Sequence, residues 1–200
     1  MSDLTAAAWE QKYQENQDRW HLGCPAPPFI NLLASALAPP PGKIAVLGCG
    51  KGQDALLFSS AGFEVIGFDF APSAIDHATN LAQARALNAQ FLQRDIFDLA
   101  TEFSHGFDYI LEHTCFCAID PTLRSSYVQL VQKLLRPQGQ LIALFYTHQR
   151  LGGPPFGIKP SEILDFFSLH FEVISFQPAK DSIDRNKGEE HLAIFQVKSK

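Results

Sequence analysis

The chain lacks the features that mark nucleic-acid-binding and membrane proteins. No run of lysine or arginine occurs in its 200 residues, and the formal net charge is -5. Nucleic acids are bound through basic patches that neutralise phosphates, so the sequence argues against a DNA or RNA substrate. No apolar run approaches the roughly 20 residues that cross a bilayer, and no basic segment leads into an apolar stretch near the start. We therefore expect a cytoplasmic protein with no nucleic-acid and no membrane partner.

Cysteine is also scarce, and its spacing argues against a metal centre. The four cysteines are Cys24, Cys49, Cys115 and Cys117. Cys115 and Cys117 have no second pair that would complete a tetrahedral zinc site, so no metal is predicted. We expect the thiols to act mostly as small buried hydrophobic side chains in a reducing compartment.

Alternating strand and helix patterns fill most of the chain. Its length fits a single domain, 1–200, in which a helical N-terminal segment, 1–38, precedes an α/β core, 43–200. Such alternation is typical of a parallel sheet covered on both faces. Helices are predicted at 5–15, 29–37, 52–61, 72–86, 121–135 and 160–168, and strands at 43–48, 64–69, 90–94, 107–112, 140–146, 171–176 and 192–197.

The most informative segment is a glycine-rich turn between two predicted strands. Gly48, Gly50 and Gly52 follow an apolar strand, and Asp69 ends the next strand about 20 residues later. Residues without a Cβ allow a sharp turn and the close approach of an adenosine-type ligand. The Asp69 carboxylate can accept hydrogen bonds from both hydroxyls of a ribose.

The residues after the last glycine narrow the choice of cofactor. Position 53 is Gln where a dinucleotide fingerprint has glycine, and Asp54 would sit poorly beside a pyrophosphate. A cationic cofactor without phosphate, S-adenosyl-L-methionine, fits better, with Asp54 near its ammonium or sulfonium group. A dinucleotide oxidoreductase remains the alternative on this motif alone.

The last quarter of the chain departs from the alternation. The strands predicted at 171–176 and 192–197 have a polar connection, 177–191, and no helix between them. This pattern predicts a hairpin that places an antiparallel strand in the sheet edge. A seven-stranded, mostly parallel sheet of this kind is the plan of the Rossmann-like class I methyltransferases.

Four segments of the chain match a known family. They are Trp9–Tyr13 with Trp20 and 23–28, Leu47–Asp54, Phe107–Pro121, and Gly152–Phe156. In these segments the chain resembles the thiol-directed methyltransferases, which include thiopurine S-methyltransferase and the halide/thiol methyltransferases, and the resemblance spans nearly the whole chain. Many unrelated methyltransferases share the glycine turn, so the first and the last segments are the more specific.

The resemblance implies that the N-terminal segment folds over the cofactor as a lid. Trp9, Tyr13 and Trp20 would lie in this lid, where an aromatic face can attract a sulfonium cation. The alternative is that Trp9 and Tyr13 belong to the apolar stripe of an ordinary amphipathic helix.

Further cofactor contacts are expected at the carboxyl ends of the strands, where open α/β sheets bind ligands. Asp95 would face the adenine amino group and Ile96 its ring, with Asp98 as a rival for the role of Asp95. The predicted cofactor-binding set is Trp9, Tyr13, Trp20, Gly48, Gly50, Gly52, Asp54, Asp69, Phe70, Asp95, Ile96 and Glu112.

Three residues are candidates for the chemistry on the acceptor side. His113 ends the fourth strand, where the methyl group should lie, and is either a proton acceptor or a structural histidine. Tyr146 ends the fifth strand; Arg124, with Tyr127, would face the acceptor or else be a surface cation. The resemblance places arginine or tyrosine at position 113, so the histidine leaves the acceptor open.

The predicted function is S-adenosyl-L-methionine-dependent methyl transfer to a small soft nucleophile, foremost a thiol sulfur, with S-adenosyl-L-homocysteine as the product. Alternative acceptors are halide, selenium or tellurium species, or an oxygen or nitrogen centre. A non-catalytic S-adenosyl-L-methionine-binding protein is the alternative of another class. We expect a monomer or weak dimer that acts on a small-molecule acceptor.

Overall fold

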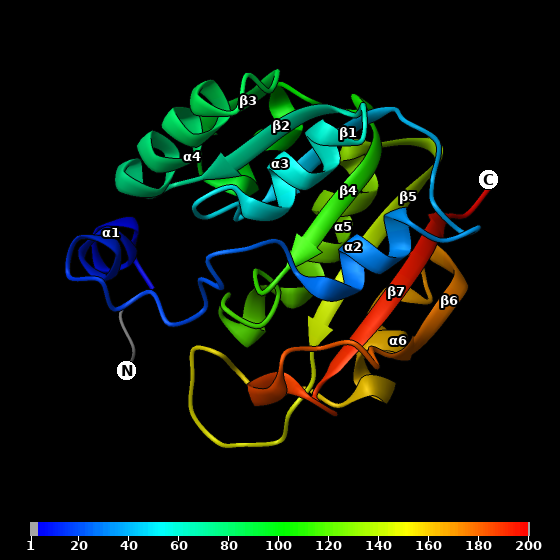
Figure 1. Cartoon of the computed structure of the whole chain (residues 1–200). Helices are drawn as coiled ribbons and strands as arrows, with labels where there is room; N and C mark the ends of the chain where they lie inside the picture. Colours follow the sequence, from blue (N-terminus) through cyan, green and yellow to red (C-terminus); the bar gives the residue numbers. More distant parts are fainter. Residues whose placement is uncertain (1–3, 200) are drawn as a thin grey trace.

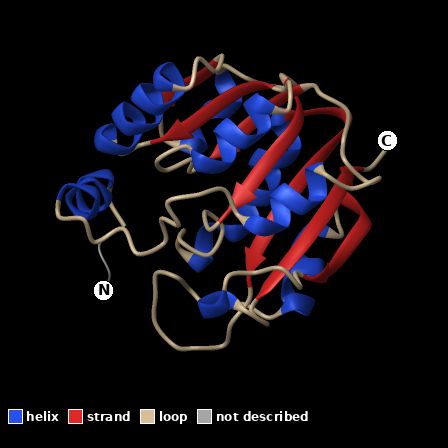
Figure 2. Ribbon diagram, in the orientation of Figure 1, coloured by secondary structure: helices blue, strands red, loops and turns tan. Residues whose placement is uncertain are grey.

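A single seven-stranded sheet organises the protein. The computed structural model describes residues 4–199 and shows the sheet crossing the whole molecule (Figures 1 and 2). The strand order is β3-β2-β1-β4-β5-β7-β6. The bounds are β1 (Lys43–Leu47), β2 (Glu64–Asp69), β3 (Ala89–Gln93), β4 (Phe107–His113), β5 (Leu135–Tyr146), β6 (Phe171–Pro178) and β7 (Glu190–Val197).

The hairpin predicted at the end of the chain is confirmed. β7 lies between β5 and β6 and is antiparallel to both. The pairs β1–β2, β1–β4, β2–β3 and β4–β5 are all parallel. The predicted class I methyltransferase sheet is therefore present, and its parallel strands end at one common edge.

Helices cover both faces of the sheet (Figure 2). The helices of the described chain are α1 (Ala6–Gln14), which lies beyond the strand ends, α2 (Pro27–Leu33), α3 (Gln53–Ser60), α4 (Pro72–Ala84), α5 (Arg124–Leu134) and α6 (Pro160–Phe167). Short 3-10 turns lie at Ile96–Thr101, Pro121–Leu123 and Asp184–Asn186.

Several predicted boundaries were wrong. α2 begins at Pro27 rather than at 29, because proline suits the first turn of a helix, and it ends four residues early at Leu33. The helix predicted from 121 starts at Arg124, after a 3-10 turn capped by Asp120. β5 begins at Leu135 rather than at 140, since Leu135 already pairs with Phe107 across an irregularity in the register.

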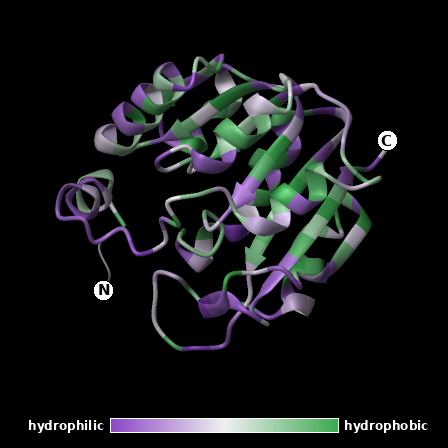
Figure 3. Ribbon diagram, in the orientation of Figure 1, coloured by the Kyte–Doolittle hydropathy of each residue, from purple (hydrophilic) through white to green (hydrophobic). Residues whose placement is uncertain are grey.

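Two apolar layers sandwich the sheet, and the central strands are the most hydrophobic part of the ribbon (Figure 3). One layer contains Phe116, Tyr127 and Phe145; the other contains Phe29 and Phe58. Within residues 4–199 no helix is long and apolar enough to cross a membrane.

The thiols are buried only in part. Cys117 is buried and Cys49 and Cys115 are half-buried, whereas Cys24 is exposed, contrary to expectation. Across the described part of the chain, no cluster of three His, Cys, Asp or Glu side chains could hold a metal ion.

Candidate active site

The glycine turn lies at the carboxyl end of β1. Gly48, Gly50 and Gly52 all have positive φ, at 60°, 52° and 80°. A Cβ on Gly52 would lie 2.8 Å from the Cβ of Ala78, so the turn is both left-handed and tightly packed against α4. The turn therefore accepts only glycine at this position without strain.

Asp69 closes the turn from the neighbouring strand. Its carboxylate accepts the Gly50 N–H at 2.9 Å and the Ala71 N–H at 3.0 Å. Burial raises the pKa of this carboxyl, against the lowering effect of the backbone hydrogen bonds. Each oxygen keeps further acceptor capacity, which fits the two hydroxyls of a ribose. The donor and acceptor set of this cradle is thus suited to a nucleoside cofactor.

An aromatic group from the N-terminal segment covers the glycine turn. Tyr13 is buried, and its hydroxyl accepts the Trp20 indole N–H at 3.2 Å. The Trp9 and Trp20 rings meet edge to face at 5.1 Å. A Cβ on Gly50 would lie 3.1 Å from the Tyr13 hydroxyl, so the tyrosine sits directly over the turn. The structure brings Trp9, Tyr13 and Trp20 together beside the glycine turn.

The N-terminal segment is also tied to α4 and to the turn by polar contacts. The Glu10 carboxylate accepts hydrogen bonds from the backbone N–H and the hydroxyl of Ser73, at the start of α4. Lys51, in the turn, forms an ion pair of 2.7 Å with Asp18. In Figure 1, α1 accordingly lies beyond the arrowhead of β2.

The residues predicted around the adenine lie after β2 and β3. Phe70 follows Asp69 and is half-buried, and its carbonyl accepts a hydrogen bond from Gln93 at 3.3 Å. Asp95 is exposed and accepts the Phe97 N–H at 3.0 Å as the cap of a 3-10 turn. Ile96 is buried in the core. The structure keeps these residues on one rim of the sheet edge.

His113 links three parts of the fold. Its Nδ1 lies 2.7 Å from Oδ2 of Asp54 in α3, and its Nε2 lies 4.0 Å from Oε1 of Glu190 in β7. The Phe29 ring of α2 packs edge-on at 5.8 Å. Burial lowers the pKa of His113, but Asp54, Glu190 and Glu112 raise it, and the net direction is upward.

Asp54 is therefore engaged on both oxygens. Oδ2 faces His113, and Oδ1 accepts the Ala26 N–H at 2.7 Å. The sequence predicts Asp54 beside the cofactor; in the structure its carboxylate joins the N-terminal segment to His113.

Glu112 points to the opposite face of the sheet from His113 and is buried. Its carboxylate accepts the Phe116 N–H at 3.0 Å and the Tyr127 hydroxyl at 2.9 Å. Burial raises the Glu112 pKa to about 7, although both hydrogen bonds and His113 lower it. Tyr127 was expected on the acceptor side and is instead fully buried in the core.

Arg124 and Tyr146 hold the loops after β5. Arg124 is buried and donates to the carbonyl oxygens of Phe156 at 3.2 Å and Gly157 at 3.3 Å. Its guanidinium thus orders the Gly152–Phe156 loop rather than pairing with a carboxylate. The Tyr146 hydroxyl donates to Glu189 at 2.8 Å and accepts from Arg150 at 2.6 Å.

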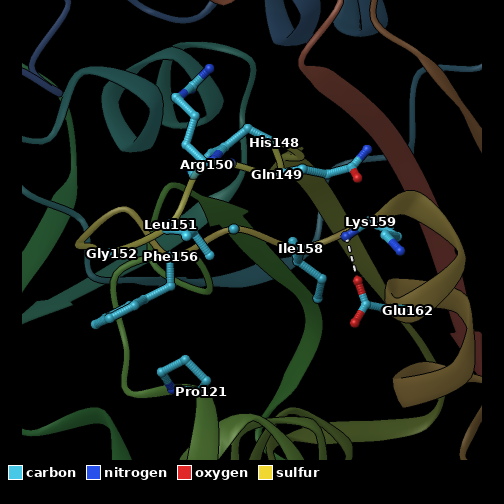
Figure 4. Close-up of a pocket in the computed structure, with 11 residues that line it drawn as sticks. Pro121, His148, Gln149, Arg150, Leu151, Gly152, Phe156, Ile158, Lys159 and Glu162 are labelled. Carbon is cyan, nitrogen blue, oxygen red and sulfur yellow. Dashed lines mark hydrogen bonds between the residues drawn. The ribbon is translucent and has the colours of Figure 1, made fainter.

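The outer side of this loop forms a hollow of about 340 Å³ (Figure 4). His148 in its wall is buried, and its Nδ1 accepts the Arg150 N–H at 3.1 Å. The lining residues are Pro121, 148–152, 156–159 and Glu162. The hollow adjoins the predicted site through the contact of Arg150 with Tyr146.

Comparison with known protein families identifies the family to which the chain belongs. The family model described as thiopurine S-methyltransferase matches residues 4–200. The chain belongs to the thiopurine S-methyltransferase family. The glycine turn, Asp69 and the N-terminal aromatics are thus features of a member of this family.

Relatives of this family member align over most of their length. A probable thiol methyltransferase 2 of Arabidopsis thaliana is 32% identical over 203 residues, which cover 100% of this chain and 88% of the relative. Thiocyanate methyltransferase 1 of Brassica oleracea is 30% identical, covering 94% of this chain and 84% of its own. A thiopurine S-methyltransferase of Pseudomonas fluorescens is 26% identical over a match that covers 82% of this chain and 83% of the relative.

Solved structures share the fold of this family member. A Burkholderia thailandensis 1,6-didemethyltoxoflavin-N1-methyltransferase, with bound S-adenosylhomocysteine, gives a TM-score of 0.70 at 18% identity, over 98% of this chain and 88% of that one. A protein described by the conversion of a disulfide bond into a thioacetal group in echinomycin biosynthesis gives 0.81 at 21% identity, over 96% and 92%.

Sequence reasoning missed Glu190, Glu189 and Arg150. Glu190 belongs to β7 but was assigned to the polar connection before it, so its burial was not foreseen. The two adjacent glutamates just before an apolar run were the available signal. In the structure Glu190 approaches His113, whereas Glu189 contacts Tyr146 and Arg150.

Proposed function

We propose that the protein is an S-adenosyl-L-methionine-dependent methyltransferase whose acceptor is a small soft nucleophile, foremost a thiol sulfur. The observation that carries the proposal is the placement of a glycine and Asp69 cradle under an aromatic cover, with His113 at the end of the adjacent strand β4. Relatives named as thiol, thiocyanate and thiopurine methyltransferases support the same reaction.

The cofactor, when bound, supplies a methyl group activated on a positively charged sulfur. Asp69 would hold the ribose and the backbone around Gly50 would lie beneath the nucleoside. Trp9, Tyr13 and Trp20 supply aromatic surface suited to a cation and cover the turn.

The protein contributes alignment and the exclusion of water. A well-oriented pair of reactants gains about 7 to 11 kcal/mol of the barrier from orientation alone, and a dry site strengthens its remaining charge interactions. The Arg124-ordered loop and the N-terminal cover provide walls on two sides. A thiol has a pKa of about 8.5, so its proton is removed easily by an imidazole.

We propose small thiols and hydrosulfide as preferred acceptors over bulky thiopurines. A histidine at position 113 can take a thiol proton and then pair with the thiolate, whereas an arginine would stay charged and suit a permanently anionic group. Thiocyanate and halide are the second candidates, because a relative that is 30% identical is named a thiocyanate methyltransferase. The four free cysteines support a reducing compartment such as the cytoplasm.

Calorimetry followed by an acceptor screen tests this proposal. We expect binding of S-adenosyl-L-methionine and no binding of NAD. Product analysis with small thiols, hydrosulfide, a thiopurine, thiocyanate, iodide and a catechol should then show methylated sulfur as the main product. Binding of NAD alone would overturn the cofactor, turnover of the catechol alone would overturn the sulfur assignment, and cofactor binding without any product would indicate a non-catalytic protein.

A further inference from the structure

The two carboxylates next to His113, those of Asp54 and Glu190, bear on which ring nitrogen carries the proton, a point that the sequence left open. A carboxylate only accepts hydrogen bonds, so the contact of 2.7 Å makes Nδ1 of His113 the donor to Asp54. Nε2 then carries the lone pair of the neutral ring. Within residues 4–199 this nitrogen makes no hydrogen bond, and its neighbour Glu190 is 4.0 Å away, beyond hydrogen-bonding distance.

Glu190 reaches His113 from a distant part of the chain. β5 lies between β4 and β7, and Leu144 of β5 pairs with both His113 and Leu192. Glu190 is only 2% exposed, and its Oε1 accepts a hydrogen bond of 2.7 Å from Asn186. The carboxylate is therefore held in place rather than free to turn toward solvent.

We propose that Asp54 and Glu190 are positioning residues that make Nε2 of His113 the proton acceptor for a thiol substrate. This inference rests on the proposed function. The S–H bond of the thiol breaks, its electron pair stays on sulfur, and the proton joins Nε2. The resulting imidazolium lies between two carboxylates, and the proton passes to solvent after methyl transfer.

The charges around the ring fit this role. Asp54 from α3, Glu190 from β7 and Glu112 from β4 itself raise the pKa of His113, and α2 contributes only the apolar ring of Phe29. An imidazolium that is stabilised in this way is a stronger base when neutral. Asp54 also fixes the ring orientation, and through Ala26 it links that orientation to the N-terminal segment.

The pH dependence of kcat/KM separates this role from a structural one. With a neutral imidazole and a neutral thiol as the reactive pair, kcat/KM for the thiol rises through the pKa of His113 and falls through that of the thiol. In His113→Gln the thiolate must form in solution, so the profile should only rise and reach a plateau at the thiol pKa.

Removing either carboxylate should move the rising limb of the profile, which is the range of pH over which kcat/KM increases through the pKa of His113. In Glu190→Gln and Asp54→Asn we expect it to shift to lower pH by about one unit or more, because an opposite charge within this distance raises a pKa by that amount. Glu189→Gln is the matched control: its carboxylate contacts Arg150 and Tyr146, and the limb should stay in place. Glu190→Gln can still accept the Asn186 hydrogen bond, so it is the variant best able to keep the fold.

Proton NMR titration of the His113 ring, without cofactor or acceptor, supplies an independent readout. We expect the same downward shifts in Glu190→Gln and Asp54→Asn and none in Glu189→Gln. The inference alone would be overturned if the pKa of His113 measured by NMR were the same in the variants as in wild type. It would also be overturned if that pKa shifted while the rising part of the kcat/KM profile did not. If the pKa of His113 shifted in the variants as expected but the wild-type protein methylated no thiol, the proposed function would be overturned, and the proton step with it.

Discussion

The backbone N–H of Gly50 donates a hydrogen bond to the carboxylate of Asp69 across 2.9 Å, which ties the turn after β1 to the end of β2. One side chain therefore holds the shape of the glycine turn and offers acceptors to a ribose. Loss of the carboxylate should affect both at once.

Asp69→Asn is expected to weaken S-adenosyl-L-methionine binding at least tenfold, because hydrogen bonds to a charged group contribute about 1.5 to 3 kcal/mol each. Calorimetry of the folded variant measures the effect. Asp165→Asn is the control, since Asp165 is an exposed carboxylate in α6 and outside the predicted cofactor-binding set. Equal affinity in wild type and Asp69→Asn would remove Asp69 from the cofactor site.

Gly52→Ala is expected to destabilise the protein more than Gly188→Ala. Both glycines have φ near +80°, which costs an L-residue about 1 to 2 kcal/mol. A Cβ on Gly52 meets Ala78 at 2.8 Å, whereas one on Gly188 meets no atom within 4 Å. Urea unfolding of the two variants separates the cost of packing from that of the backbone conformation. Equal losses would show that the turn yields without cost.

Glu112 is expected to make the protein less stable as pH rises from 4.5 to 7. Burial raises its pKa in the folded state to about 7 from an ordinary value of 4.5, so over this range the folded state binds more protons than the unfolded state. The free energy of unfolding therefore falls with rising pH, by on the order of 3 kcal/mol for this group.

Glu112→Gln isolates that contribution. The difference in free energy of unfolding, variant minus wild type, should increase as pH rises through the same range. Urea titrations at several pH values measure this difference. A constant difference between variant and wild type would show that the Glu112 carboxyl titrates normally.

Arg124→Met is expected to raise KM for the acceptor roughly tenfold and to leave cofactor affinity unchanged. The variant loses hydrogen bonds from a charged donor to the carbonyls of Phe156 and Gly157, so the loop that we propose lies over the acceptor loses its order. Steady-state kinetics and calorimetry measure the two quantities. Arg136→Met, which removes a surface ion pair with Asp108, serves as control. A rise in cofactor Kd equal to the rise in KM would contradict the assignment.

The N-terminal segment is expected to behave as a lid. Amide exchange over residues 8–20 should slow when S-adenosyl-L-homocysteine binds, since the aromatic cover then has a ligand beneath it. Trp20→Phe removes the hydrogen bond to Tyr13 and should reduce the slowing. Amides of β6, at the far sheet edge, provide the internal reference. Equal exchange with and without ligand would make the segment a permanent part of the core.

Local features of the site could be predicted from the sequence, whereas its long-range pairs could not. The glycine turn and Asp69 are close in sequence, and their spacing alone predicts that they lie side by side. The contact of His113 with Asp54 depends on the register of β1 against β4, in which Leu47 pairs with Glu112. The approach of Glu190 depends on the insertion of β7 beside β5, which brings together residues 77 positions apart. Periodicity contains no information on either register.

The predicted start of α2 was wrong because its first residues suit both a loop and the first turn of a helix. Pro27 and Pro28 were assigned to a loop, but proline at the start of a helix needs no hydrogen-bond donor, and the helix begins there. Tyr127 lies on the same apolar face of α5 as Val128 and Val131, so helical spacing could have predicted its burial. The burial of the charged Arg124 on that face has no such signal.

The position of β7 also sets an order of assembly. Among residues 4–199, β6 pairs only with β7, so it has no partner in the sheet until the residues of β7 have been synthesised. Until then β5 presents an open edge with apolar side chains such as Leu141 and Phe145, a surface prone to association with other chains. A nascent or truncated chain that stops before residue 190 would thus need chaperone protection, and it would also lack Glu190 beside His113. Completion of the sheet and completion of the proposed proton-accepting site are the same event.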